Sequence, residues 1–117
     1  MSIKDWRVRI EDILEALHRI RQYCRGMNAA EFAADTRTVD AVVRNLEIIG
    51  EAARRIPPQV TQRHPGIPWS RMAEMRNILI HEYHSVDADI IWKTVIGDLP
   101  PLAAPLQALL AEPVEAE

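Results

Sequence analysis

The stretch "EMRNILIHEYHSVD", residues 74–87, concentrates side chains that carry protons or bind anions. It holds Arg76, Asn77, His81 and Tyr83 within eight positions. Histidine suits proton transfer because its pKa lies near neutrality. Arginine carries a permanent positive charge on a planar fork that matches a phosphate group. These residue types at this spacing are consistent with chemistry on a phosphodiester.

Metal-independent cleavage of RNA is one chemistry that this stretch could serve. RNA supplies its own nucleophile, the 2′-hydroxyl, so an enzyme must remove that proton, protonate the leaving 5′-oxygen and stabilise a negative phosphorane. His81 suits the proton steps and Arg76 suits the phosphorane. Five residues on a helix correspond to a rotation of about 140° and a rise of about 7.5 Å, so the arginine has to swing round. Asn77 shares a face with His81 and could bind the imidazole or the phosphate.

Two other interpretations of the same residues stay open. His81-Glu82-Tyr83-His84 is similar to the metalloprotease helix, but that motif needs histidines four residues apart, and these are three apart. A metal would also need further ligands, and the remaining histidines have no telling spacing, so we expect no metal site. The structural interpretation is that these side chains cap a helix, anchor a core edge or form ion pairs.

The composition predicts one helical domain. The 117 residues are 48% hydrophobic but only 5% aromatic, which favours a helical core of aliphatic side chains. Cys24 is the only cysteine, so neither an intramolecular disulfide nor a four-cysteine zinc site can form. No signal peptide is evident, and no apolar run approaches the roughly 20 residues of a membrane span. We expect a cytoplasmic protein that does not engage a membrane.

Charge is distributed unevenly along a chain whose net charge is −3. Residues 1–76 hold 13 basic and 10 acidic side chains, whereas residues 77–117 hold 1 and 7. Twelve of the 14 basic residues are arginines. The net charge argues against a general nucleic-acid-binding protein, but a local arginine-lined site could still bind phosphate.

Apolar residues recur every three or four positions and predict a series of helices. The first covers residues 2–24, and a short helix follows Asn28 as its N-cap. A long helix over residues 36–56 is expected to be capped by Thr36 or Thr38. Gly50 in its middle costs about 1 kcal/mol relative to Ala, which predicts close approach of a neighbouring helix, in this chain or in a second subunit.

The second half of the chain contains more prolines and shorter helices. A proline-rich connector precedes a helix that starts near Pro68–Trp69 and runs into residues 74–87. Asp87 is expected to cap another helix, and residues 105–112 to form the last one. We therefore predict an all-α bundle of four to five helices, with one domain over residues 1–112 and a frayed tail over residues 113–117.

The motif and its flanks resemble a known family. "RNILIHEY" matches the pattern R-x-x-x-x-H-x-Y with Asn directly after the Arg, as in HEPN domains of the HepT-like branch. "RNLEIIGEAARRIP", "IPWSRMAEMRN" and "HSVDADIIWKTVIGDLPPL" are similar to the segments around that motif in the family. The resemblance covers roughly residues 4–110, and these proteins are toxins of HepT/MNT-type (type VII-like) toxin–antitoxin pairs.

The resemblance implies a metal-independent endoribonuclease on a HEPN-type bundle. Arg76 and His81 would be catalytic, with Asn77 assisting, and two chains would dimerise so that their motifs face one cleft. The partner would be an MNT-type nucleotidyltransferase antitoxin that transfers AMP to Tyr83 and so blocks RNA. ATP and Mg²⁺ would belong to that partner, and this chain would need no cofactor.

An alternative within the same family is a non-catalytic HEPN module that binds a nucleotide or docks onto its partner. The presence of Arg76, His81 and Tyr83 favours the enzyme. A helix-pairing argument also predicts that Glu51 pairs with Arg76 across the bundle. Glu82 could raise the pKa of His81, and neither the identity of the RNA nor a role for His84 follows from the sequence.

Overall fold

The computed structural model describes the backbone of residues 5–81 and 87–113, and the side chains of residues 6–76 and 87–113. These residues contain helices, turns and no strand, which confirms the all-α bundle. The α-helices are α1 (Asp5–Tyr23), α2 (Ala29–Ala34), α3 (Thr36–Arg54), α4 (Pro58–Thr61), α5 (Trp69–His81), α6 (Ala88–Lys93) and α7 (Ala103–Ala111). A π-helical turn, Thr94–Asp98, and a 3-10 turn, Pro100–Leu102, join the last two.

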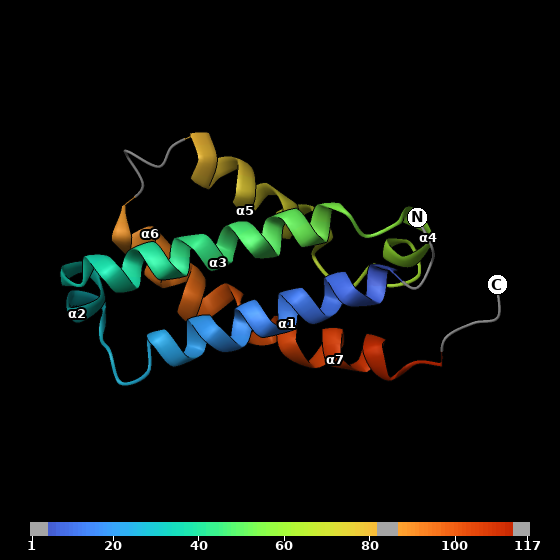
Figure 1. Cartoon of the computed structure of the whole chain (residues 1–117), viewed down its shortest axis with the longest axis horizontal. Coiled ribbons are helices and arrows are strands. Elements are labelled where there is room, and N and C mark those ends of the chain that lie inside the picture. Colours follow the sequence, from blue (N-terminus) through green and yellow to red (C-terminus); the bar gives the residue numbers. More distant parts are fainter. Residues whose placement is uncertain (1–4, 82–86, 114–117) are drawn as a thin grey trace.

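Helices α1 and α3 form a long antiparallel pair that runs the length of the molecule (Figure 1). The chain reverses between them at Gly26, whose φ of +75° lies in the region that favours glycine. The expected cap at Asn28 is confirmed as a capping box. The Asn28 side chain accepts from the Glu31 N–H at 2.8 Å, and the Glu31 carboxylate accepts from the Asn28 N–H at 3.0 Å.

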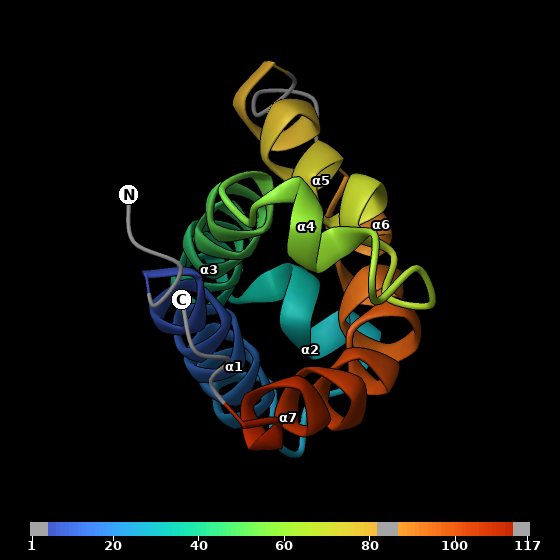
Figure 2. The same cartoon turned by 90° about the vertical axis from the view of Figure 1, so that its right-hand side faces the viewer.

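The remaining helices close the bundle around this pair. In the end-on view, α1, α3, α6 and α7 surround the core, while α5 stands at the edge of the bundle against α3 (Figure 2). The segment from α6 to α7 returns under α1, where the Arg7 guanidinium donates to the carbonyl oxygens of Leu110 and Glu112. These contacts satisfy carbonyls that the end of α7 would otherwise leave unpaired.

The core consists almost entirely of aliphatic side chains, as the composition predicts. Most of the apolar residues of α1 and α3 that were expected to face the core are buried, while Leu14, Leu17 and Val39 are only partly buried. The largest side chains with essentially no exposure are Phe32, Ile10, Ile13, Ile20, Ile49, Met72, Leu106, Leu109 and Val42. Phe32 of α2 also packs against the Trp92 ring of α6, with ring centroids 5.2 Å apart. The core therefore draws on every part of the described chain.

The helical run Ala88–Ala111 is longer and more apolar than the sequence analysis allowed. It has 24 residues and contains an 18-residue window with a mean hydropathy of 1.2, so it satisfies length and composition criteria for a membrane span, which core helices of soluble proteins also satisfy. Within it the buried residues recur every three or four positions: Ile91, Val95, Leu99, Leu102, Leu106 and Leu109. That spacing is typical of a helix that turns one face to a protein core.

Two local expectations in the middle of the chain were wrong. The N-cap of α3 is Asp35, whose side chain accepts from the Thr38 N–H at 3.1 Å, so neither Thr36 nor Thr38 caps it. Part of the proline-rich connector forms the short helix α4, because Pro58 at its first turn has no N–H to leave unpaired.

The Asp87 cap of α6 is confirmed by its bond from the Asp89 N–H at 2.9 Å.

Candidate active site

The helix that carries the motif, α5, is anchored at its N-terminal end. The indole N–H of Trp69 donates to the carbonyl oxygen of His64 at 3.0 Å, and the Met72 N–H donates to the carbonyl oxygen of Pro68 at 3.0 Å. The Met72 side chain is fully buried. The Trp69 bond and the buried Met72 side chain fix the start of α5 against the rest of the chain, whereas the bond from Met72 to Pro68 closes the first turn of the helix itself.

Arg76 lies directly against Gly50 of α3. A Cβ atom added to Gly50 would sit 2.6 Å from the Arg76 Cβ and 2.8 Å from the Arg76 N. Both distances are shorter than real contacts of a Cβ atom, so only glycine allows α5 to approach α3 this closely. The close helix approach expected at Gly50 is confirmed, and the neighbouring helix is α5 of the same chain.

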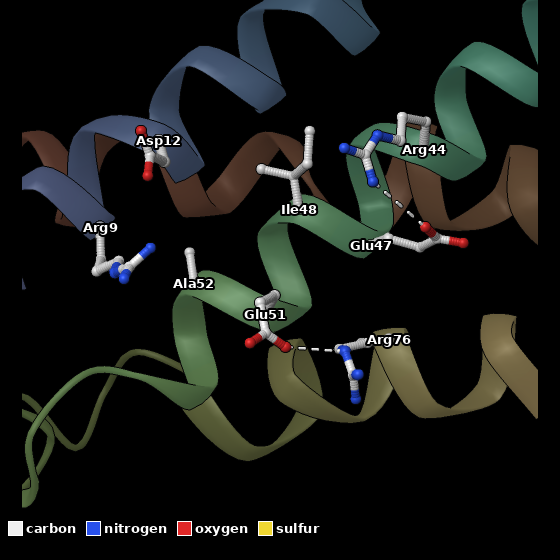
Figure 3. Close-up of a pocket in the computed structure, with 8 residues that line it drawn as sticks. All are labelled: Arg9, Asp12, Arg44, Glu47, Ile48, Glu51, Ala52 and Arg76. Atoms are coloured by element: carbon white, nitrogen blue, oxygen red, sulfur yellow. Dashed lines mark ion pairs between the residues drawn. The ribbon is translucent and has the colours of Figure 1, made fainter.

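Arg76 also forms the ion pair with Glu51 that the sequence predicts. Its Nε lies 2.8 Å from the Glu51 Oε2, and both side chains are about one-third exposed, at 32% and 31%. In Figure 3 the two outer nitrogens of the guanidinium point away from the carboxylate. Arg76 therefore pairs with Glu51 through its Nε, and its two terminal nitrogens are directed away from that carboxylate.

Glu51 is held by two more arginines, Arg54 in the last turn of α3 and Arg55 at its C-cap. The Arg55 Nε donates to Glu51 Oε1 at 2.8 Å, and an Arg54 terminal nitrogen donates to the same oxygen at 3.3 Å. The hydrogen bond from Arg55, followed by the bond and charge of Arg54 and the charge of Arg76, lowers the pKa of Glu51 below its ordinary value. The carboxylate is therefore ionised at neutral pH, and three guanidinium groups surround its single negative charge.

An open pocket of about 390 Å³ adjoins this cluster. Helix α1 supplies Arg9 and Asp12, α5 supplies Arg76, and α3 supplies the remaining residues: Arg44, Glu47, Ile48, Glu51 and Ala52 (Figure 3). Arg44 and Glu47 pair loosely at 3.8 Å, and Arg44 is 72% exposed. Charged side chains from three helices thus line a pocket that a charged, extended ligand could enter.

The other motif residues are only partly within the described structure. Asn77 and His81 lie on the backbone of α5, but their side chains are outside the described residues. Tyr83 lies outside them altogether, as do Glu82 and His84. The structure thus places Arg76, and the roles expected of Asn77, His81 and Tyr83 stay predictions.

No cluster of metal-binding side chains occurs in the part of the chain that the structure describes. His64, one of the histidines available for such a site, instead lies with its Nε2 3.5 Å from a Glu112 carboxylate oxygen, near the end of α7. The metal interpretation of His81 and His84 falls on residues whose side chains are not described, so it stays untested.

Sequence analysis missed the contribution of α1 to this pocket. Arg9 and Asp12 are three residues apart and therefore lie on one face of α1, next to the buried stripe. The excess of arginine in residues 1–76 was the only available signal. That excess does not identify which of the arginines lie near Arg76 in the folded chain.

Comparison with known proteins adds evidence from outside this chain. The family described as "Ribonuclease HepT-like" matches residues 13–109. A probable ribonuclease HepT of Thermococcus cleftensis is 45% identical over 108 residues, which cover 92% of this chain and 96% of that protein. A putative RNase of Methanocaldococcus jannaschii is 40% identical over 100 residues, which cover 86% and 83%. A putative RNase of Caldanaerobacter subterraneus is 36% identical over 101 residues, which cover 86% and 90%. No solved structure matches the chain.

Proposed function

We propose that this chain, which belongs to the family of HepT-like ribonucleases, cleaves RNA internally without a metal ion. The observation that carries the proposal is the placement of Arg76. It is one of the residues that line a charged pocket, is fixed by Gly50 and Glu51, and directs one edge of its guanidinium away from its ion pair. A planar, permanently charged group in that position is suited to a phosphorane.

In the proposed reaction a histidine removes the proton of the 2′-hydroxyl as that oxygen attacks phosphorus. The bond between O2′ and phosphorus forms, the bond between phosphorus and O5′ breaks, and a second proton transfer produces a free 5′-hydroxyl. The products are a 2′,3′-cyclic phosphate and a 5′-hydroxyl end. We assign the proton steps to His81, stabilisation of the phosphorane to Arg76, and positioning of the imidazole or the phosphate to Asn77.

Two chains together would supply both proton-transfer groups. In a homodimer with two motifs at one cleft, the His81 of one chain acts as base while that of the other acts as acid. The position of α5 at the edge of the bundle, packed mainly on α3, supports this arrangement because one side of the motif helix faces out of the fold (Figure 2).

The enzyme would be inhibited by modification of Tyr83, which a partner protein carries out. A nucleotidyltransferase antitoxin transfers AMP from ATP to the Tyr83 hydroxyl: a bond from that oxygen to the α-phosphorus forms, and pyrophosphate leaves. The added nucleotide is bulky and anionic and stands two residues from His81, so it would exclude RNA and compete for Arg76. The chain would then be a toxin of the cytoplasm that its antitoxin silences covalently.

The test is cleavage of total RNA by the purified chain in EDTA, beside His81→Ala, Arg76→Ala and the control His18→Ala. His18 is an exposed histidine of α1 that does not line the pocket. We expect 2′,3′-cyclic phosphate ends from the native chain and from His18→Ala, and at least about a 100-fold loss in the other two. Equal activity in all four folded proteins, or none in the native chain, would favour a non-catalytic binding module.

A further inference from the structure

We propose that Gly50 and Glu51 are positioning residues of the reaction: together they seat Arg76 so that its guanidinium is already oriented before RNA arrives. This inference rests on the proposed ribonuclease function, because it assigns Arg76 to the phosphorane. It adds two residues of a different helix, 26 and 25 positions earlier in the chain, to the machinery around the motif.

Gly50 sets the position of the Arg76 backbone. Among the described residues only Gly26 has a positive φ, so no unusual backbone conformation requires a glycine at position 50. In the middle of a helix, glycine instead costs about 1 kcal/mol relative to Ala. The contact with Arg76 accounts for that cost, because the atoms that a Cβ would meet are the Cβ, N and Cα of Arg76 at 2.6, 2.8 and 3.1 Å. The Arg76 backbone and Cβ therefore leave no room for a side chain at position 50.

Glu51 sets the direction of the Arg76 side chain. Arginine has many rotamers, and a free guanidinium would have to be ordered each time a phosphate binds. The pair between Nε and Oε2 holds one edge of the guanidinium at 2.8 Å. The outer nitrogens point away from the carboxylate and are not engaged by it (Figure 3). Ordering of this kind before the reaction is what lowers a barrier that depends on precise placement of charge.

The surrounding positive charges keep the Glu51 carboxylate from repelling the phosphodiester substrate. Its carboxylate also pairs with Arg54 of α3 and with Arg55, the C-cap residue of that helix. One negative charge therefore stands among three positive ones, and the cluster keeps a positive excess that attracts a phosphodiester. Arg54 and Arg55, at the C-terminal end of α3, also hold the carboxylate in place, so that Glu51 is itself a fixed partner for Arg76.

The first test is the pair Glu51→Gln and Glu15→Gln. Glu15 forms an exposed pair with Arg19 at 2.7 Å on α1, does not line the pocket and serves as a matched control. With a short RNA substrate we expect Glu51→Gln to lower kcat about 10- to 100-fold with KM changed less than about threefold, and Glu15→Gln to change neither. An unchanged kcat in a folded Glu51→Gln protein would overturn the proposal.

A second readout does not depend on cleavage. In ¹⁵N-labelled protein we expect the Nε–H signal of Arg76 to be ordered in the native chain and in Glu15→Gln, and to become averaged and mobile in Glu51→Gln. The Arg76 signal is assigned by its loss in Arg76→Lys. If the native chain cuts no RNA but this signal responds as expected, the ribonuclease function fails while the seating of Arg76 stands. A signal that is equally ordered without the Glu51 carboxylate overturns the seating.

The third variant addresses Gly50. Gly50→Ala should lower the melting temperature, shift the Arg76 signal and reduce kcat at least about tenfold, because a Cβ forces Arg76 away from α3. Gly97→Ala is the control, since a Cβ there would meet nothing within 4 Å. Native kcat and a native Arg76 signal in Gly50→Ala would contradict the proposal. If Gly50→Ala does not fold, the Glu51 variants decide.

Discussion

At the scale of single residues, the pairing of Arg76 with Glu51 is better explained by orientation than by stability. Partly exposed ion pairs contribute about 0–1 kcal/mol to folding. Both side chains are about one-third exposed, so the pair stabilises the protein only slightly. Its larger effect is to reduce the freedom of a long side chain in the place where a charged ligand would bind.

The pH dependence of activity should separate Glu51 from His81. The pKa of Glu51 is lowered, first by the bond from Arg55, so its pairs are fully present above the ordinary range of a glutamate and are lost only as the pH falls through the lowered value. Between pH 5 and 9 any change in kcat/KM should therefore come from other groups, with histidine the expected one near neutrality. We expect the pH–rate profiles of the native chain and Glu51→Gln to have the same shape and different heights. A limb near neutrality that vanishes in Glu51→Gln would contradict this assignment.

At the scale of helices, α3 is the element that organises the site. It packs on α1 and α5 and supplies more than half of the pocket lining. Its N-terminus is closed by Asp35, which accepts from the Thr38 N–H at 3.1 Å and satisfies one of the donors that a helix start leaves unpaired. The bond from Thr38 also lowers the pKa of Asp35. A weak cap would fray the start of the helix on which the pocket is built.

The identity of this cap gives a stability prediction. Asp35→Ala should lower the melting temperature at pH 7 by about 4 °C. Asp35→Asn should lower it much less, because asparagine caps a helix as well as aspartate. Thr36→Ala, at a cap position that the sequence favoured, should have a smaller effect. Because the pKa of Asp35 is lowered in the folded protein, its charge stabilises above the ordinary aspartate range, and the gap between native and Asp35→Asn should narrow as the pH falls below it. Thermal unfolding followed by circular dichroism measures all four proteins, and an Asp35→Ala protein as stable as the native chain would exclude the cap.

At the scale of the whole molecule, our proposal builds one catalytic cleft from two chains. The bundle places α5 at its edge (Figure 2), and the described residues near Arg76 include no histidine among those that line the pocket. The proposed reaction needs a base and an acid, and two copies of His81 supply them only when two chains meet.

A mixing experiment tests that dependence on two chains. When native chains are unfolded and refolded together with a ninefold excess of His81→Ala chains, most native chains pair with an inactive partner. We expect activity per native chain to fall at least about fivefold, because a cleft with one histidine lacks either base or acid. Dilution with Glu15→Gln chains should cause no loss, and light scattering should give the mass of a dimer in each mixture. Unchanged activity per native chain would show that each protomer works alone.

The sequence was sufficient for the helical architecture and for the family because both depend on local patterns. Apolar residues three and four apart defined α1 and α3, Asn28 and Asp87 marked two helix starts, and the motif with its flanks predicted the family that the comparisons confirm. The cap of α3 could not be chosen in this way, because Asp35, Thr36 and Thr38 all have side chains that can cap a helix. The choice depends on which residue stands in a non-helical conformation next to the first turn.

Only the tertiary structure decided what surrounds Arg76. Helix pairing suggested that Glu51 could reach it, but the 2.8 Å ion pair, the contact with Gly50 in the same chain and the presence of Arg9 from α1 all depend on how α1, α3 and α5 stack. Stacking brings together residues that are far apart in the sequence, and no local periodicity encodes those distances. A motif of eight residues therefore predicts the chemistry, while Gly50 and Glu51 of α3 determine where its arginine stands.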